Sequence, residues 1–164
     1  MSIGNILHIS LMDGFIIHFI VIHIIKDLVA SMCKENMLIF IHFNLLKKIQ
    51  VGDVGGRIWA GKRDELEVAK KELIEGLKEL ENVLGDKPYF GGDTFGFVDI
   101  SLIPFYSWFY TYEKLCNFKV EEECEKLIAW AKRCKQRDSV SKSVADEKEV
   151  YDFVVNYRKR FELD

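Results

Sequence analysis

One stretch of the chain, from Thr94 to Tyr112, holds a single charged residue, Asp99, in an otherwise apolar and aromatic run. A helix that is apolar on every side belongs in the middle of a helical bundle, where other helices cover all of its faces. The run therefore predicts a buried central helix that begins at Phe97. Pro104 falls inside it and is expected to kink the helix or loosen its first turns, because proline lacks the N–H that a helix interior uses.

Asp99 needs a partner in such a place, because burying an isolated carboxylate costs several kcal/mol. If the helix begins at Phe97, Gly96 is its N-cap residue and Asp99 is its third residue. The carboxylate can then accept a hydrogen bond from the N-cap N–H, and it faces the positive end of the helix dipole. Phe95 and Ile100 are placed to form a hydrophobic staple. We therefore expect Gly96 and Asp99 to be a structural cap, not catalytic residues.

Three further stretches predict amphipathic helices, at residues 63–84, 121–137 and 147–161. Each carries apolar side chains at intervals of three and four, and charged residues cover the other faces. Gly85 and Pro88 supply stop signals after the first stretch. No alternating strand pattern competes after residue 51, so the predicted fold class is all-α, a helical bundle. The expected buried stripe of the first helix consists of Leu66, Ala69, Leu73, Leu77, Leu80 and Leu84.

The composition changes near residue 50 and divides the chain into two unlike pieces. Residues 1–50 contain all four histidines but no Trp, Tyr or Pro, whereas residues 51–164 contain every Trp, Tyr and Pro. A membrane-spanning helix needs about 20 apolar residues. The apolar runs at 14–25 and 37–46 are shorter than that. We expect residues 1–50 to be an unrelated apolar segment of uncertain structure that does not span a membrane, followed by a helical domain at 51–164.

Charge and cysteine content argue against several function classes. A net charge of −3 and a pI near 5.9 give no basic footprint for nucleic acid. The short basic runs at 132–137 and 158–160 are expected to be solvated helix ends. The four cysteines have no CxxC spacing and the histidines have no paired-ligand spacing, so we expect no metal site, and free thiols in a reducing cytoplasm. The glycine-rich loop at 87–94 lacks the spacing of a phosphate loop.

Several segments of the sequence resemble segments of a known protein family, in the same order and with the same spacing. They are RIWAGK at 57–62, LGDKPYFGGDTFGFVDISLIPFYSWFYTYEK at 84–114, KLIAWAKRC at 126–134 and VYDFV at 150–154. Together they resemble the C-terminal helical domain of plant tau-class glutathione S-transferases. The resemblance covers roughly residues 54–164, and the arrangement of a glycine N-cap with an aspartate three positions on is what the tau class tends to show.

The resemblance implies a function and a site. In this family an N-terminal thioredoxin-like domain binds glutathione and uses a serine hydroxyl to stabilise the thiolate, and the C-terminal helices bind an apolar electrophile. Such pockets are mostly apolar and aromatic, with a few polar groups. For each residue the alternative is packing in the core. The positions that match the family's electrophile site are Trp59, Trp108, Phe153, Tyr157 and Arg160.

Residues 1–50 depart from the family pattern, because they contain no Ser-Pro, no proline and no Glu-Ser pair that match its glutathione-binding features. We therefore expect no catalytic residue, no glutathione site and no other cofactor in this chain, and a truncated, inactive transferase. The alternatives are a non-catalytic helical ligand-binding module and a membrane-tethered or unstable product. Apolar small molecules are the expected partners. A homodimer is not assured, because the family's dimers use both domains.

Overall fold

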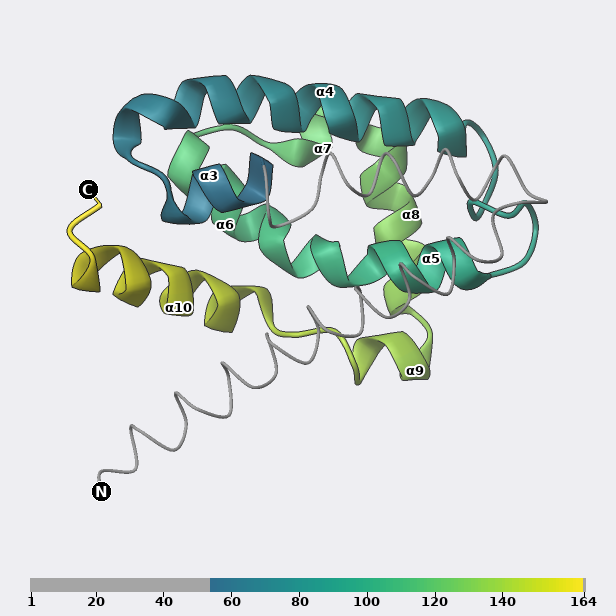
Figure 1. Ribbon diagram of the computed structural model, residues 1–164. Helices are drawn as coiled ribbons and strands as arrows, with labels where there is room; N and C mark the ends of the chain where they lie inside the picture. Colours follow the sequence, from purple (N-terminus) through teal and green to yellow (C-terminus); the bar gives the residue numbers. More distant parts are fainter. Residues whose placement is uncertain (1–53, 164) are drawn as a thin grey trace, which may run out of the picture. The chain divides into compact units, whose positions relative to one another are not determined.

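The computed structural model describes residues 54–163, which belong to one compact unit built from helices (Figure 1). Extended pairing in this range is limited to one bridge between Tyr89 and Gly92. The expected all-α fold is confirmed, and the interpretations of residues 1–50 lie outside the described residues. The elements are α3 (Val54–Ala60), η2 (Arg63–Glu65), α4 (Leu66–Leu84), α5 (Phe97–Leu102), η3 (Ile103–Phe105), α6 (Tyr106–Cys116), α7 (Val120–Glu123), α8 (Glu125–Lys135), α9 (Asp138–Ser141) and α10 (Glu147–Arg160).

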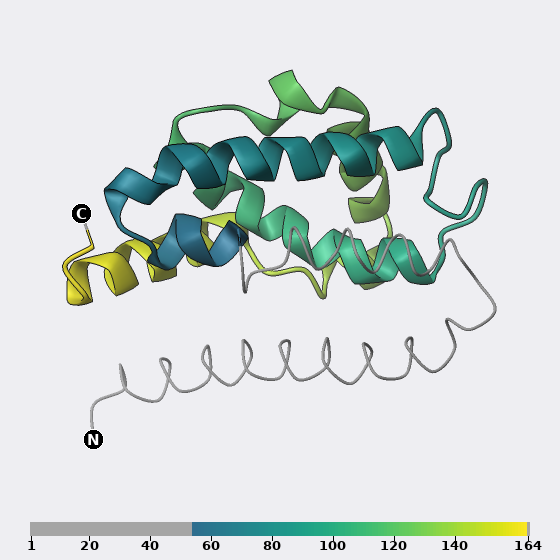
Figure 2. The ribbon, with the colours of Figure 1, turned by 45° about the horizontal axis from the view of Figure 1, so that its top comes forward.

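The longer helices form layers, with α6 between α4 and α10 (Figures 1 and 2). Helix α8 crosses these layers steeply and packs against α4. The short helix α3 contacts α4, α6 and α10, so it packs against all three layers. Between residues 54 and 163 no helix combines the length and the apolarity that crossing a membrane requires.

Helix α4 follows the stripe expected from its sequence. All six apolar residues of the stripe are buried, from Leu66 to Leu84, and charged side chains cover the opposite faces. The helix ends at Leu84, and the C-cap residue Gly85 has a φ of 60°, in the left-handed region that glycine adopts without strain. The stripe supplies the core-facing side of the longest element in the described range.

The central run is interrupted where Pro104 was expected to disturb it. Helix α5 ends at Leu102, a 3₁₀ turn over Ile103–Phe105 contains Pro104, and α6 continues from Tyr106. The proline removes one backbone donor, and the tighter turn accommodates that loss. Ile100 is 56% exposed, so the expected staple between Phe95 and Ile100 is not what the structure shows. Instead, the Phe95 ring packs edge-on against Tyr89 at 5.7 Å.

The helix predicted at 121–137 is divided at Cys124. Helix α7 ends before it and α8 begins after it, and Cys124 itself has φ −145° and ψ 69°. The carboxylate of Glu81, on α4, accepts hydrogen bonds from the backbone N–H groups of Lys126 and Leu127 at 2.7 and 3.1 Å. A side chain from another helix therefore caps α8, and this long-range contact permits a break that local periodicity does not indicate.

Candidate ligand-binding site

Four of the five residues predicted for an electrophile site lie in one aromatic cluster, which we define as Trp59, Trp108, Phe153 and Tyr157. The Trp59 ring lies 6.1 Å from the Trp108 ring and 5.2 Å from the Tyr157 ring, measured between centroids. Phe153 lies 6.4 Å from Tyr157. The cluster therefore joins α3, α6 and α10, three elements that are far apart in the sequence and adjacent in the fold.

Two aromatic residues that sequence reasoning missed extend the aromatic cluster. Phe161 lies 4.6 Å from Tyr157, and Tyr112 stacks on Trp108 at 6.2 Å. Arg160, the fifth predicted residue, is exposed, and its guanidinium lies 5.9 Å from the Phe161 ring. Phe161 follows Phe153 and Tyr157 at intervals of four, so the helical spacing of α10 contained a signal for it. Tyr112 gave no comparable signal, because it lies at the end of the apolar and aromatic run at 94–112, in which many aromatic residues are expected to be buried for packing alone.

Exposure increases from one end of the aromatic cluster to the other. Trp108 and Tyr112 are 6% and 2% exposed, Trp59 and Tyr157 are partly exposed, and Phe161 is 54% exposed. The inner end is therefore part of the core, and the outer end forms apolar surface. Such a graded aromatic wall can bind the flat face of an apolar molecule, since aromatic groups supply large contact areas at low entropic cost.

Two polar atoms of Trp59 and Tyr112 are buried without a hydrogen-bond partner among the described residues. They are Nε1 of Trp59 and the hydroxyl of Tyr112. Burial raises the pKa of the Tyr112 phenol, so the hydroxyl stays protonated and remains a donor. An unsatisfied buried donor is costly, and a ligand atom or water that accepts its hydrogen bond offsets this cost.

Arg158 corrects the interpretation of the basic run at 158–160 as a solvated helix end. Its side chain is 1% exposed. One terminal nitrogen donates to the carbonyl oxygens of Ile58, Trp59 and Gly61 at 3.3, 3.5 and 3.0 Å, and the other donates to the carbonyl of Leu163 at 3.0 Å. A charge in a basic run usually remains in water, but here the C-terminal end of α3 presents carbonyl groups that stabilise it.

The Asp99 side chain is fully buried and accepts three hydrogen bonds. Gly96 N–H donates to Oδ2 at 2.9 Å, which is the cap contact expected from the sequence. Phe90 N–H and the indole Nε1–H of Trp130 both donate to Oδ1, at 3.0 and 2.8 Å. The last two donors come from a loop and from α8 and were missed, because no local pattern connects them to Asp99. The three contacts join a loop, α5 and α8, and none of the three donors belongs to the aromatic cluster.

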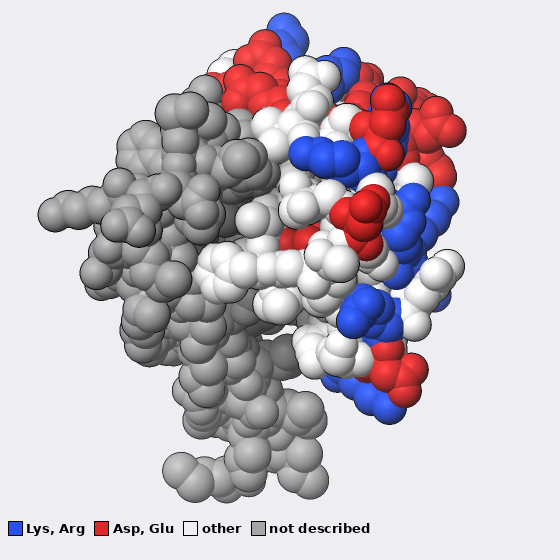
Figure 3. All heavy atoms as spheres, turned by 90° about the vertical axis from the view of Figure 1, so that its right-hand side faces the viewer, with Lys and Arg blue, Asp and Glu red and all other residues white. Residues whose placement is uncertain are grey.

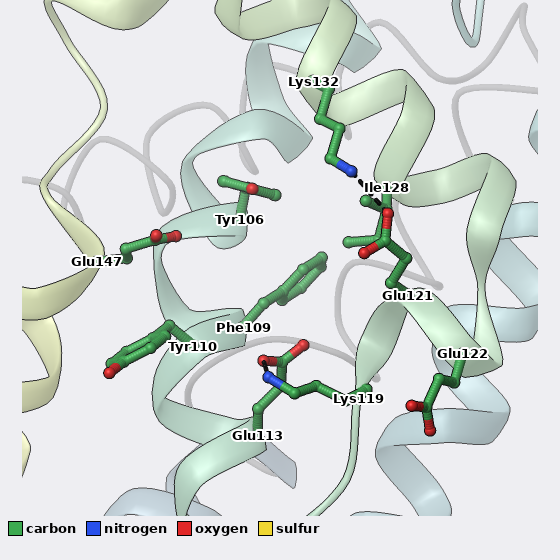
Figure 4. Close-up of a pocket in the computed structure, with 10 residues that line it drawn as sticks. All are labelled: Tyr106, Phe109, Tyr110, Glu113, Lys119, Glu121, Glu122, Ile128, Lys132 and Glu147. Atoms are coloured by element: carbon green, nitrogen blue, oxygen red, sulfur yellow. Dashed lines mark hydrogen bonds and ion pairs between the residues drawn. The ribbon is translucent and has the colours of Figure 1, made fainter.

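A separate surface pocket of about 420 Å³ lies between α6, α7, α8 and the start of α10 (Figure 4). Both lysines in its lining are paired, Lys132 with Glu121 at 2.6 Å and Lys119 with Glu113 at 3.0 Å. Burial, and secondarily the charge of Glu147, raises the pKa of Tyr106 in the lining of this pocket. None of the five predicted residues lines this pocket. Its lining is Tyr106, Phe109, Tyr110, Glu113, Lys119, Glu121, Glu122, Ile128, Lys132 and Glu147.

Acidic and basic side chains alternate on the face that contains the loop between α4 and α5, and uncharged residues lie between them (Figure 3). The described part of this face therefore has no continuous field of one sign. Within residues 54–163, no three His, Cys, Asp or Glu side chains converge in a way that can hold a metal ion. Cys116, Cys124 and Cys134 are buried and form no disulfide.

Comparison with known proteins gives a consistent result. Residues 63–133 match the family model of the glutathione S-transferase C-terminal domain. The chain is 58% identical over 112 residues to probable glutathione S-transferase parC of Nicotiana tabacum, covering 68% of this chain and 51% of that protein. It is 54% identical over 118 residues to glutathione S-transferase U21 of Arabidopsis thaliana, covering 72% and 53%.

A solved structure agrees with these sequence matches. Rice GST1 (OsGSTU1), solved in complex with glutathione, superimposes with a TM-score of 0.66 at 41% identity, over 71% of this chain and 53% of that chain. The chain thus spans about half the length of the relatives that it matches. The described residues contain the C-terminal helical domain of the glutathione S-transferase family, and their relatives are plant tau-class members.

Proposed function

We propose that this domain forms the wall of an apolar-electrophile site for glutathione conjugation. In that reaction the glutathione sulfur attacks an electrophilic carbon, a carbon–sulfur bond forms, and a leaving group such as chloride departs. The observation that carries the proposal is the convergence of Trp59, Trp108 and Tyr157 from three helices. Phe153 and Arg160 belong to the same proposed site, at its more exposed end.

The thiolate chemistry needs groups outside this aromatic wall. A glutathione thiol is activated by donors aimed at its sulfur, which lower its pKa. The predicted aromatic residues supply apolar contact, and the sequence of residues 1–50 contains no match to the family's glutathione site. We propose that these 164 residues by themselves bind apolar ligands and conjugate glutathione no faster than the uncatalysed background.

The alternative is a non-catalytic ligand-binding module, which makes the same prediction for these 164 residues alone. The two proposals differ when a glutathione-binding domain is present. Fusing the part of rice GST1 that lies outside the match to this chain should produce conjugation activity if the aromatic cluster is an electrophile site. A ligand-binding module should gain no activity in the fusion, although it should still bind apolar molecules.

Binding can be measured at single-residue level, because the chain has three tryptophans in two different places. Trp59 and Trp108 lie in the aromatic cluster, whereas the Trp130 indole is bonded to Asp99. Titration with 2,4-dinitrotoluene, an apolar nitroaromatic without a leaving group, should shift the indole N–H signals of Trp59 and Trp108 and leave that of Trp130 in place. Glutathione with 1-chloro-2,4-dinitrobenzene tests conjugation in the same samples.

A matched pair of variants tests which surface binds the ligand. Tyr157→Ala removes one ring of the aromatic cluster, and we expect it to weaken dinitrotoluene binding about fivefold. Tyr106→Ala removes a ring from the separate pocket and should leave the affinity unchanged. If Tyr106→Ala weakens binding and Tyr157→Ala does not, the pocket between α6 and α8 is the binding site and the proposal is wrong.

Two further expectations accompany this proposal. We propose a cytoplasmic location, supported by three buried thiols that form no disulfide within the described residues.

We also propose the division into an unrelated segment at 1–50 and a helical domain at 51–164. Limited proteolysis should remove the first segment before it cuts the second, and size-exclusion chromatography with light scattering should show whether the chain forms a homodimer.

A further inference from the structure

The structure assigns a positioning role to Arg158, an inference that rests on the proposed function of the aromatic cluster. We propose that Arg158 fixes the C-terminal end of α3 on α10 and thereby holds the Trp59 ring against Tyr157 and Trp108. Arg158 follows Tyr157 directly in α10, and one of its acceptors is the backbone carbonyl of Trp59 itself. Both residues of the Trp59–Tyr157 contact are therefore tied to one buried guanidinium.

Helix α3 requires such an anchor, because it has little stability of its own. It has only seven residues, and two of them are glycines, Gly55 and Gly56. An isolated helix of this length is unstable in water, and glycine lowers its stability further. Its last carbonyl groups lack intrahelical donors, and a cation beside them is favoured by the helix dipole. Packing against the neighbouring helices and the hydrogen bonds of Arg158 together stabilise α3, because its local sequence does not.

The turn after α3 is shaped to bring its carbonyl groups to Arg158. Gly61 N–H donates to the Arg57 carbonyl at 3.1 Å, and a Cβ at Gly61 would lie 2.2 Å from that same oxygen. A residue with a side chain would therefore have to move the backbone. The Gly61 carbonyl, in turn, accepts the shortest of the Arg158 hydrogen bonds to this segment, at 3.0 Å. The close approach needs glycine at this position.

An arginine suits this place better than a lysine. The planar guanidinium presents five donors in a fixed fork, so one side chain can bind carbonyls from two segments at once. Arg158 uses this geometry to bind the end of α3 with one nitrogen and Leu163, in the turn after α10, with the other. A lysine ammonium presents a single nitrogen and cannot occupy both positions.

The affinity for a ligand depends on the fraction of molecules in which the end of α3 is attached to α10. If the end of α3 detaches, the Trp59 ring loses its fixed position, and only the attached fraction of molecules has a complete wall. The apparent dissociation constant rises in inverse proportion to that fraction, so a tenfold loss of the attached state weakens binding about tenfold. This effect is separate from global unfolding, because α6 packs against both α4 and α10 without α3.

The test uses the full chain with three variants and two readouts. Arg158→Lys keeps the charge and removes the fork, and Arg158→Met keeps an apolar stem of similar length and removes every donor. Lys159→Met, at the exposed neighbouring position, is the matched control. The readouts are dinitrotoluene affinity and the nuclear Overhauser contacts between the Trp59 and Tyr157 rings, both measured where urea titration shows the variants fully folded.

We expect about tenfold weaker binding and loss of the Trp59–Tyr157 contacts in Arg158→Lys and Arg158→Met, with no change in Lys159→Met. Leu80→Ala, a core truncation near the other end of α4, controls for lowered stability alone and should keep both properties. If Leu80→Ala weakens binding equally, or if both Arg158 variants keep the ring contacts, Arg158 has no positioning role. If wild type does not bind dinitrotoluene, the proposed function fails, and the ring contacts still decide the role of Arg158.

Discussion

Replacing Asp99 with alanine removes a junction between three segments. The carboxylate binds Gly96 N–H at the start of α5, Phe90 N–H in the preceding loop and the Trp130 indole on α8. All three contacts are 3.0 Å or shorter, and the side chain has no exposed surface. Alanine leaves the three donors in place with no acceptor, in a space from which water has been excluded.

The cost can be calculated from the number of donors. A buried donor that loses its acceptor costs about 1–3 kcal/mol. The three donors surround one small space, and a single water molecule that enters it can satisfy some of them. We therefore expect Asp99→Ala to lower the free energy of unfolding by about 3–5 kcal/mol, which is a large part of the 5–15 kcal/mol or so that a typical domain has.

Urea unfolding of the full chain, followed by tryptophan emission, measures this cost. Asp99→Asn is an informative second variant, because one amide oxygen can still accept from Phe90 and Trp130. Its NH₂ group then faces the Gly96 N–H, so we expect an intermediate loss of about 1–3 kcal/mol. Asp93→Ala, an exposed acid in the same loop, is the control and should change the stability by less than about 0.5 kcal/mol.

One outcome contradicts this reasoning directly. If Asp99→Ala costs less than about 1 kcal/mol while the indole signal of Trp130 keeps its wild-type position, the carboxylate does not satisfy these donors. A loss equal to that of Asp93→Ala leads to the same conclusion. An Asn variant as unstable as the Ala variant contradicts only the assignment of two donors to one oxygen.

Three further predictions concern stability and use the same urea measurements. Gly61→Ala should cost about 1–3 kcal/mol, because its Cβ meets the Arg57 carbonyl at 2.2 Å, whereas Gly91→Ala should be nearly neutral, because its Cβ lies 3.8 Å from the nearest atom. Glu81→Ala should cost about 1–2 kcal/mol through the lost cap of α8, and the exposed Glu75→Ala should be nearly neutral. Burial raises the pKa of Cys116 and Cys124 to about 11 and that of Cys134 to about 12. As the pH rises, these thiols therefore lose their protons in the unfolded chain before they do so in the folded chain. The free energy of unfolding should then fall as the pH rises above about 9. Cys124→Ala should make this decline shallower, and an unchanged slope contradicts the role of that thiol.

Most of the fold could be predicted from the spacing of apolar residues. The stripe from Leu66 to Leu84 repeats every three or four positions, and a helix is the conformation that places such residues on one face. Pro104 has a fixed local effect, so the interruption after Leu102 also follows from sequence. The break at Cys124 does not, because the cap of α8 is the carboxylate of Glu81, 45 residues before Lys126, and periodicity contains no information on such contacts.

In the candidate site, too, some features could be predicted from the sequence and others depend on long-range contacts. Motif resemblance selected Trp59, Trp108, Phe153 and Tyr157, and the structure brings them together as one aromatic cluster. Arg158 was misread, because a charged residue in a basic run is normally solvated and only the tertiary structure shows which carbonyls it meets. For the same reason the Trp130 indole was not recognised as a partner of Asp99, from which it is separated by 31 residues.

The three bonds of Asp99 have a consequence for amide hydrogen exchange. Glycine-rich connections usually exchange within seconds, but in this one Phe90 and Gly96 donate their protons to a carboxylate that α8 also holds. Those protons can exchange only after the fully buried carboxylate of Asp99 releases them, so these two amides should exchange at the rate at which the packing around Asp99 opens. Two amides in a connection between helices would then report how often the centre of the bundle opens.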